Sequence, residues 1–137
     1  MAKPGRPARG DREPTLPDSE LEVMRMLWKF QKATARQVWT SLSEEGSKWT
    51  YATVNTLLQR LEGKGLATAD KTQMTYVYSP KVNKAVVIKK RIKHLVDKLY
   101  DGESGPLLMH LLKSQKLSKD DITELEDIVE TARKTTD

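Results

Sequence analysis

The chain has 137 residues, no cysteine and a net charge of +5, from 24 Lys and Arg against 19 Asp and Glu. A chain of this length forms one ordinary domain or two small ones. The lack of cysteine excludes disulfides, thiolate metal sites and cysteine nucleophiles. The longest apolar run, residues 85–88, is too short for a membrane span, and no apolar segment follows the charged N-terminus as in a secretory signal. We therefore expect a cytoplasmic protein.

Charge is distributed unevenly along the chain. Residues 1–15 are rich in Pro, Gly and Arg without periodicity, which predicts a disordered basic arm. Residues 81–100 carry 7 basic groups and 1 acidic group, whereas residues 101–137 carry 5 basic and 9 acidic groups. The basic middle indicates an anionic partner, and a solvated helix face balanced by another helix is the alternative.

Residues 16–49 predict two helices. The first follows Pro17, where Asp18 or Ser19 can cap it and Glu22 would complete a capping box with Ser19. The second begins at Thr34. Apolar residues at helical spacing define the inner faces of both. These residues are Leu21, Met24, Leu27 and Trp28 in the first helix and Ala35, Val38, Trp39 and Leu42 in the second.

Residues 50–80 predict a third helix and a β-hairpin. The helix begins at Thr50 or Tyr51 and ends at the glycines of residues 63–65. Its apolar face consists of Tyr51, Val54, Leu57, Leu58 and Leu61. A strand then runs into the polar turn at residues 70–73, and the alternating residues 74–78 form a second strand that stops at Pro80.

Residues 81–137 predict three more helices. Apolar residues at heptad spacing predict a seam in the first of them, Pro106 lies in the first turn of the second, and Ser118 with Asp121 caps the third. We interpret this region as a dimerisation domain; a helical subdomain packed on the first domain is the alternative. The expected dimer contacts are Ile88, Ile92, Leu95, Leu99, Leu107, Leu108, Leu111, Leu112, Ile122, Leu125 and Ile128.

Three helices followed by a hairpin is the order of a winged helix, a variant of the helix-turn-helix. The sequence thus predicts a mainly α chain with a small β-hairpin: a winged-helix domain over residues 16–80 and a helical domain over residues 81–137. Residues 50–61 contain no Asp or Glu, as a surface facing DNA phosphates requires. The third helix would enter the major groove, where Asn and Gln amides can bond adenine and Arg can bond guanine or phosphate. The expected DNA contacts are Arg36, Thr50, Tyr51, Ala52, Thr53, Asn55, Thr56, Gln59 and Arg60, with Lys71, Thr72 and Gln73 at the tip of the 66–78 wing.

Four motifs in order resemble the BlaI/MecI family of penicillinase and methicillin-resistance repressors. ELEVMRMLW at residues 20–28 is similar to the opening of that family, and TVNTLLQRL at 53–61 with KGL at 64–66 is similar to its recognition helix. YVYSP at residues 76–80 resembles the end of its wing. GPLL at 105–108 and LSKDDI at 117–122 resemble its dimerisation segment.

The resemblance implies a dimeric winged-helix repressor that binds double-stranded DNA at an inverted-repeat operator and is associated with the bacterial nucleoid. In this family a regulatory protease cuts the dimerisation region after a membrane sensor detects a β-lactam. The matching position here reads His110-Leu111, where the family commonly has Asn-Phe. The family often has Lys or Arg where this chain has Ala52 and Asn55, which questions the operator sequence rather than DNA binding.

No catalytic set is apparent, because the two histidines, His94 and His110, lack metal-ligand or acid–base spacing. We therefore expect no enzyme activity, no cofactor and no metal. Two other classes remain open at this point. One is a winged-helix module that binds a protein. The other is a ligand-sensing regulator, which needs a pocket lined by convergent polar groups.

Overall fold

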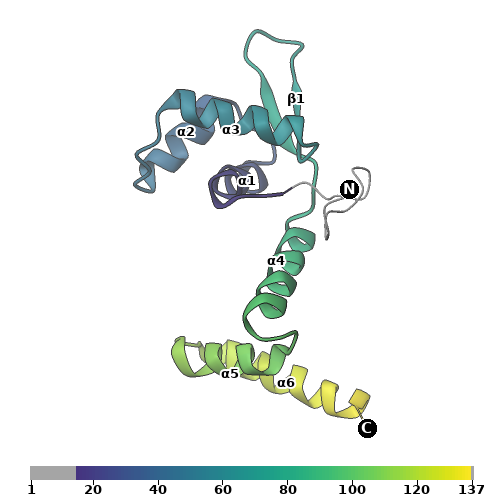
Figure 1. The fold of residues 1–137 in the computed structure, drawn as a ribbon. Coiled ribbons are helices and arrows are strands. Elements are labelled where there is room, and N and C mark those ends of the chain that lie inside the picture. The colour runs from purple at the N-terminus through teal and green to yellow at the C-terminus, as the bar shows by residue number, and fades with distance from the viewer. Residues whose placement is uncertain (1–14, 137) are drawn as a thin grey trace, which may run out of the picture. The chain divides into compact units, whose positions relative to one another are not determined.

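The computed structural model describes residues 15–136, so the predicted arm lies outside the described residues except for Thr15. Within them the chain forms six helices and one two-stranded sheet (Figure 1). The elements are α1 (Asp18–Phe30), α2 (Ala35–Glu44), α3 (Tyr51–Gly63), β1 (Ala67–Asp70), β2 (Val77–Pro80), α4 (Lys84–Leu99), α5 (Ser104–Ser114) and α6 (Lys119–Thr136). The chain divides into an N-terminal unit up to Val87 and a C-terminal unit from Ile88. This division falls inside α4, whereas the predicted domain boundary follows Pro80.

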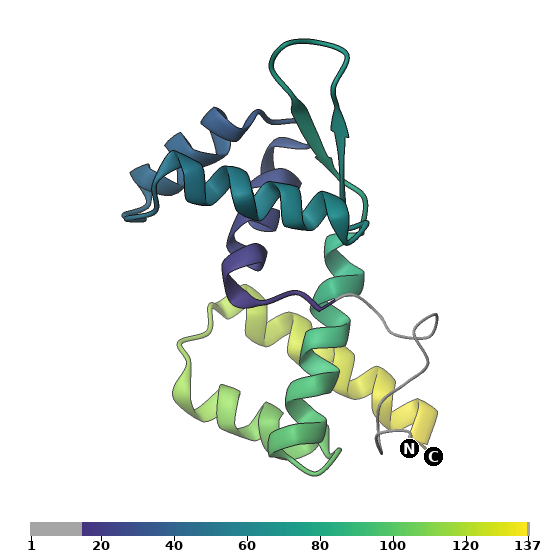
Figure 2. The ribbon, with the colours of Figure 1, turned by 45° about the horizontal axis from the view of Figure 1, so that its top comes forward.

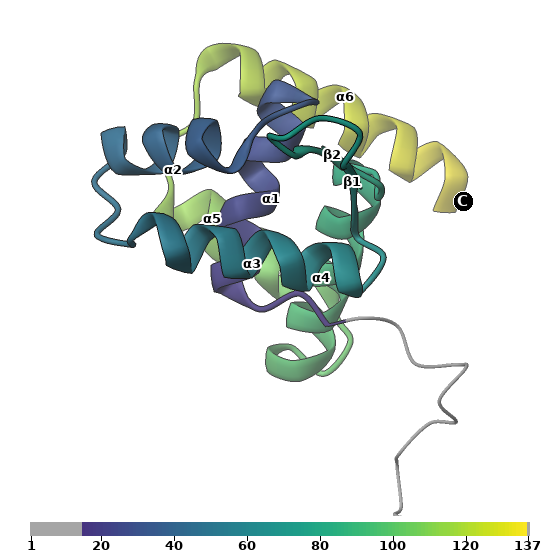
Figure 3. The same cartoon turned by 90° about the horizontal axis from the view of Figure 1, so that it is seen from above.

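The N-terminal unit has one hydrophobic core. Helices α1, α2 and α3 pack against one another (Figure 3), and the sheet packs against α1 and α3. Most of the apolar positions predicted to face inward are fully buried there, including Met24, Val38 and Leu58. The hairpin projects beyond the helices (Figures 1 and 2). The fold of this unit is a winged helix, as predicted.

The predicted cap of α1 is wrong. The helix begins at Asp18 with Pro17 at the N-cap position, and no side chain caps it. Asp18 and Ser19 already lie inside the first turn, where neither is placed as an N-cap side chain must be. Glu22 instead accepts a hydrogen bond from Arg25 at 3.1 Å. The helix starts earlier than predicted, so the two residues that were expected to precede it as caps are already part of it.

The capping boxes of two later helices form. At α2 the Thr34 hydroxyl accepts from the N–H of Gln37 at 3.2 Å, and the Gln37 side chain accepts from the N–H of Thr34 at 2.8 Å. At α6 the Ser118 hydroxyl accepts from the N–H of Asp121 at 3.0 Å, and Asp121 accepts in return at 3.4 Å. Both boxes fix a helix start and satisfy otherwise free N–H groups.

The second strand starts later than predicted. Strand β1 pairs with β2 in antiparallel register, from Ala67 opposite Pro80 to Asp70 opposite Val77, so residues 74–76 lie in the connecting loop. The Asp70 carboxylate accepts from the N–H and the hydroxyl of Thr72, at 3.0 and 2.6 Å. This turn ends β1 at Asp70 and leaves residues 74–76 without a facing residue in β1.

The C-terminal unit buries little of its apolar surface within one chain. Among the described residues, α5 and α6 contain no buried residue, and α4 buries only Val96. Of the predicted dimer contacts, Leu107 and Leu125 are half-buried and the others are exposed. No helix within residues 15–136 has the length and apolar character needed to cross a membrane.

Candidate nucleic-acid interface

The residues that α3 buries in the core determine which of its side chains point outward. Val54, Leu57, Leu58 and Leu61 are buried in the core. Thr50 caps the helix, because its hydroxyl accepts from the N–H of Thr53 at 3.2 Å. The remaining predicted contacts on this helix are therefore turned away from the core. Tyr51, Ala52, Thr53, Thr56, Gln59 and Arg60 are exposed and Asn55 is half-buried. Tyr51, which the sequence also assigns to the apolar face, is 41% exposed and lies at the surface.

Arg36 at the start of α2 lies against two aromatic rings. Its guanidinium carbon is 5.5 Å from the ring centre of Tyr51 and 6.0 Å from that of Trp39. The two rings meet edge to face at 6.0 Å, and the Trp39 indole N–H donates to the carbonyl of Trp49 at 3.0 Å. Stacking on aromatic rings holds a guanidinium in place while leaving its donors available. Arg36 and Tyr51 were predicted from the sequence as contact residues, but Trp39 was not. Its spacing of three residues from Arg36 on the same helix could have indicated that the two side chains meet.

The predicted basic group of the wing is tied to α3. The ammonium group of Lys71 is 2.9 Å from the Glu62 carboxylate and 5.5 Å from the ring centre of Tyr76. The hydrogen bond to Glu62 raises the pKa of Lys71. Thr72 is held in the Asp70 turn, and Gln73 is exposed in the loop. Glu62 was missed, because sequence spacing does not reveal which loop residue folds back onto a helix.

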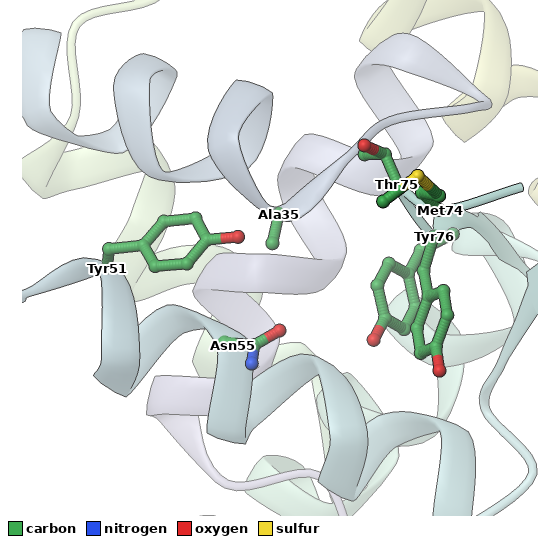
Figure 4. A pocket seen from close by; sticks show the side chains of 7 residues that line it. Ala35, Tyr51, Asn55, Met74, Thr75 and Tyr76 are labelled. Carbon is green, nitrogen blue, oxygen red and sulfur yellow. The ribbon is translucent and has the colours of Figure 1, made fainter. Parts of the chain in front are cut away.

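A pocket of about 260 Å³ opens between α2, α3 and the wing (Figure 4). We call it the hydroxyl pocket, because tyrosine and threonine hydroxyls make up most of its polar groups. In Figure 4 the side chain of Tyr51 extends toward Ala35, and Asn55 lies on α3 beside them. The pocket brings two predicted contact residues, Tyr51 and Asn55, together with residues that were not predicted to belong to the site. Its lining is Ala35, Tyr51, Asn55, Met74, Thr75, Tyr76 and Tyr78.

The polar groups of this surface are suited to hydrogen bonding and to anions. Residues 50–61 carry Arg60 but no carboxylate, and no Asp or Glu lines the hydroxyl pocket. Within residues 15–136 no group of three or more His, Cys, Asp or Glu side chains is placed to hold a metal ion. The arrangement offers amides, hydroxyls and a guanidinium on one face of the N-terminal unit, which is the chemistry that reads base edges and phosphates.

The predicted cleavage position lies elsewhere, in the C-terminal unit. His110 and Leu111 are exposed and lie within α5. The carbonyl of His110 accepts a hydrogen bond from the Ser114 hydroxyl at 2.7 Å. The peptide bond between the two residues is therefore part of a helix.

Comparison with known proteins shows which family the chain resembles. The penicillinase repressor family matches residues 16–131. The penicillinase repressor of Bacillus licheniformis is 31% identical over 85% of this chain and 91% of its own length. The methicillin resistance regulatory protein MecI of Staphylococcus aureus (strain N315) is 28% identical over 81% of this chain and 89% of its own. A solution structure of the DNA-binding domain of the repressor BlaI covers 54% of this chain and 89% of its own, with 34% identity and a TM-score of 0.48. The chain belongs to the penicillinase repressor family.

Proposed function

We propose that the chain is a DNA-binding transcriptional repressor that reads an inverted-repeat operator as a homodimer. Its family is one of repressors rather than enzymes. The observation that supports DNA binding most directly is the outer face of α3, which is polar, free of carboxylates over residues 50–61 and flanked by Arg36. This surface fits the major groove, and the wing beside it fits the adjacent backbone or minor groove.

The outward-facing side chains divide between base reading and backbone contact. Asn55 and Gln59 are one helical turn apart on the same side of α3, so both amides can meet adenine edges in one groove. Ala52 and the threonine methyl groups fit thymine methyls. Arg36, Arg60 and Lys71, with hydroxyls at Thr50, Tyr51 and Thr72, are suited to phosphates, and Gln73 at the wing to the backbone or minor groove.

The homodimer is supported by the apolar faces of the C-terminal unit. Ile92 on α4, Leu111 on α5 and Ile128 on α6 are 50%, 43% and 62% exposed in the single chain. A soluble chain rarely leaves so many large apolar groups in water, and a second copy would bury them. The two-fold axis of such a dimer would place two α3 helices one DNA turn apart.

Regulation by a protease is the third part of the proposal, at the His110-Leu111 bond. Because both residues lie inside α5, this helix must unwind locally before a protease can take the bond in extended form. The repressor would act in the cytoplasm, in association with the nucleoid where its operator lies.

Selection of bound duplexes from a random pool, at two salt concentrations, tests the proposal. Enrichment of an inverted repeat that persists at the higher salt is the expected result, because base contacts are less sensitive to salt than phosphate contacts. Binding without a motif that disappears at the higher salt would contradict operator recognition. A chain that stays monomeric and binds no DNA would favour a protein-interaction module.

The recovered duplex then tests the assigned residues. Replacing Asn55 or Gln59 by Ala is expected to weaken binding by about 1–3 kcal/mol and to relax the preference at the contacted base pairs. Replacing Lys71 by Ala is expected to weaken binding to all duplexes alike and to flatten the salt dependence. Unchanged affinity and preference in both amide variants would contradict the assignment of α3 as the reading helix.

A further inference from the structure

The apolar seam of α4 runs between two rows of basic side chains. Its four apolar side chains are all exposed in the single chain: Ile88, Ile92, Leu95 and Leu99. In a heptad pattern the flanking positions are e and g, and within residues 88–99 these positions are Lys89, Arg91, Val96 and Lys98. Val96 is buried, so every exposed flanking side chain is basic. The one carboxylate of α4, Asp97, pairs with Lys93 at 2.8 Å.

Neither a second copy of α4 nor DNA fits this seam. When two identical helices pair in either direction, the flanking positions of one meet those of the other. Two α4 helices would thus bring basic groups against basic groups, which repel. DNA would neutralise the basic rows but would leave the apolar seam between them in water. The seam therefore requires a helix with an apolar stripe and acidic flanks.

Helix α6 has this complementary pattern. Its apolar stripe consists of residues at spacings of three and four: Ile122, Leu125 and Val129. The side chains that flank the stripe are all acidic: Asp121, Glu124 and Glu126. Residues 120–130 contain six acidic residues and no basic one. Within residues 15–136 neither Glu124 nor Glu126 has an ion pair, and α6 buries no residue.

The helix that covers the seam comes from another chain. The seam is exposed although α6 of the same chain is present, so α6 does not cover it within one chain. In a two-fold symmetric dimer, a contact between α4 of one chain and α6 of the other forms twice. Such a dimer would bury both apolar surfaces and bring opposite charges together on both sides of each contact.

We propose that the seam of α4 in one chain packs against the stripe of α6 in a second copy, with Lys89 and Lys98 beside Glu124 and Glu126. This inference rests on the proposed homodimer and deepens it, because it names the two surfaces that meet. The apolar side chains supply the buried area, and the charged rows determine which helices pair.

The test exchanges the charges of the two helices. One variant carries Lys89→Glu with Lys98→Glu, and the other carries Glu124→Lys with Glu126→Lys. Sedimentation equilibrium measures the mass of each variant alone and of an equimolar mixture. Each variant alone should have a dimer dissociation constant about a hundredfold higher, since symmetry turns each reversed pair into two pairs of like charge. In a mixed dimer both contacts again join opposite charges, so the mixture should dimerise as the unchanged protein does.

The control variant carries Asp127→Lys with Glu130→Lys, which makes the same change of charge on the side of α6 away from the stripe. It should dimerise as the unchanged protein does. Salt gives an independent readout, because it screens attraction and repulsion alike. Added salt should weaken the dimer of the unchanged protein and strengthen that of the two test variants.

Four outcomes overturn the inference. The first is a Glu124→Lys, Glu126→Lys protein that dimerises normally, and the second is a control that is weakened equally. The third is a mixture that does not recover, because pairs within one chain cannot be restored by mixing. The fourth is a Lys89→Glu, Lys98→Glu protein that stays dimeric but loses affinity for a half-site duplex, which would assign the basic rows to DNA.

The unchanged protein separates failure of the inference from failure of the proposed function. If it binds the inverted repeat as a dimer, each of these four outcomes leaves the proposed function standing and removes only the pairing of α4 with α6. If it stays monomeric at all concentrations, the homodimer itself is overturned, and the inference with it.

Discussion

At the scale of single residues, burial decides how much an ion pair contributes to stability. Glu20 on α1 is 3% exposed and pairs with Lys64, which also donates to the carbonyl of Thr15 at 2.9 Å. Glu22 and Arg25 make a pair whose side chains are 46% and 42% exposed. Periodicity could not distinguish the two glutamates, because both are polar residues on one helix. Which of them turns inward depends on the position of Lys64, at the end of α3, in the folded chain.

Replacing Glu20 by Ala is expected to lower the free energy of unfolding by about 2 kcal/mol, below the full cost of breaking a buried pair because Lys64 is partly solvated. Glu22→Ala, the matched control on the same helix, should change it by less than about 0.5 kcal/mol. Urea unfolding of both variants measures the difference. Equal effects would contradict the assignment of a structural role to the buried pair.

Gly65 illustrates a backbone requirement that the sequence does reveal. It follows the C-cap of α3 with φ of +77°, and a Cβ added there would meet no atom within 4 Å. Gly65→Ala should therefore destabilise the fold by about 1 kcal/mol through backbone conformation alone. Gly63→Ala, inside α3, should be neutral or stabilising, because Ala is the better helix former. Thermal unfolding of the two variants measures whether each substitution raises or lowers stability. A destabilised Gly63→Ala variant together with an unaffected Gly65→Ala variant would contradict the backbone requirement at Gly65.

At the scale of elements, sequence pattern predicted all six helices described, but it misplaced a strand end and a cap. The starts of α2 and α6 could be predicted, because their capping residues form hydrogen bonds within four residues of each other in the sequence. The start of β2 depends instead on register and on the bridge between Ala33 and Tyr78, with N–H to carbonyl distances of 2.8 and 3.0 Å in the two directions. Local chemistry is therefore visible in the sequence, whereas contacts between distant segments are not. The same rule holds for the candidate site, where α3 was predicted and the pocket was not.

The contact between the wing and α3 gives a prediction at this scale. Glu62 holds Lys71 and offsets its charge, so Glu62→Gln should free a cation at the DNA surface and remove a repelling carboxylate. We expect affinity for duplexes of any sequence to rise about three- to tenfold at low salt, with a steeper salt dependence. Glu45→Gln, which alters an exposed pair with Arg25, is the control. Filter binding over a salt series measures both, and weaker binding by Glu62→Gln would mean that the pair orients the wing productively.

At the scale of the whole molecule, the two units differ in how they reach stability. The N-terminal unit has a core of its own, whereas α5 and α6 bury no residue among those described. The heptad seam of Ile88, Ile92, Leu95 and Leu99 predicted an apolar surface, and each of these side chains is exposed in the single chain. A sequence shows that such an apolar surface exists. What covers this surface depends on a second molecule and has to be measured.

The dimer supplies the last prediction. Ile92→Glu puts a charge into the seam of α4, where burial against a second copy would desolvate it, so we expect a monomer. Ile92→Leu keeps an apolar side chain of the same size and should remain a dimer. Sedimentation equilibrium measures the mass, and titration with full and half operators measures the consequence. The Glu variant should lose affinity for the full inverted repeat by about a hundredfold, because the second half-site is no longer bound in the same complex. Its affinity for a single half-site should be unchanged, since α3 and the wing lie in the other unit. A dimeric Ile92→Glu protein would show that the seam is covered in another way.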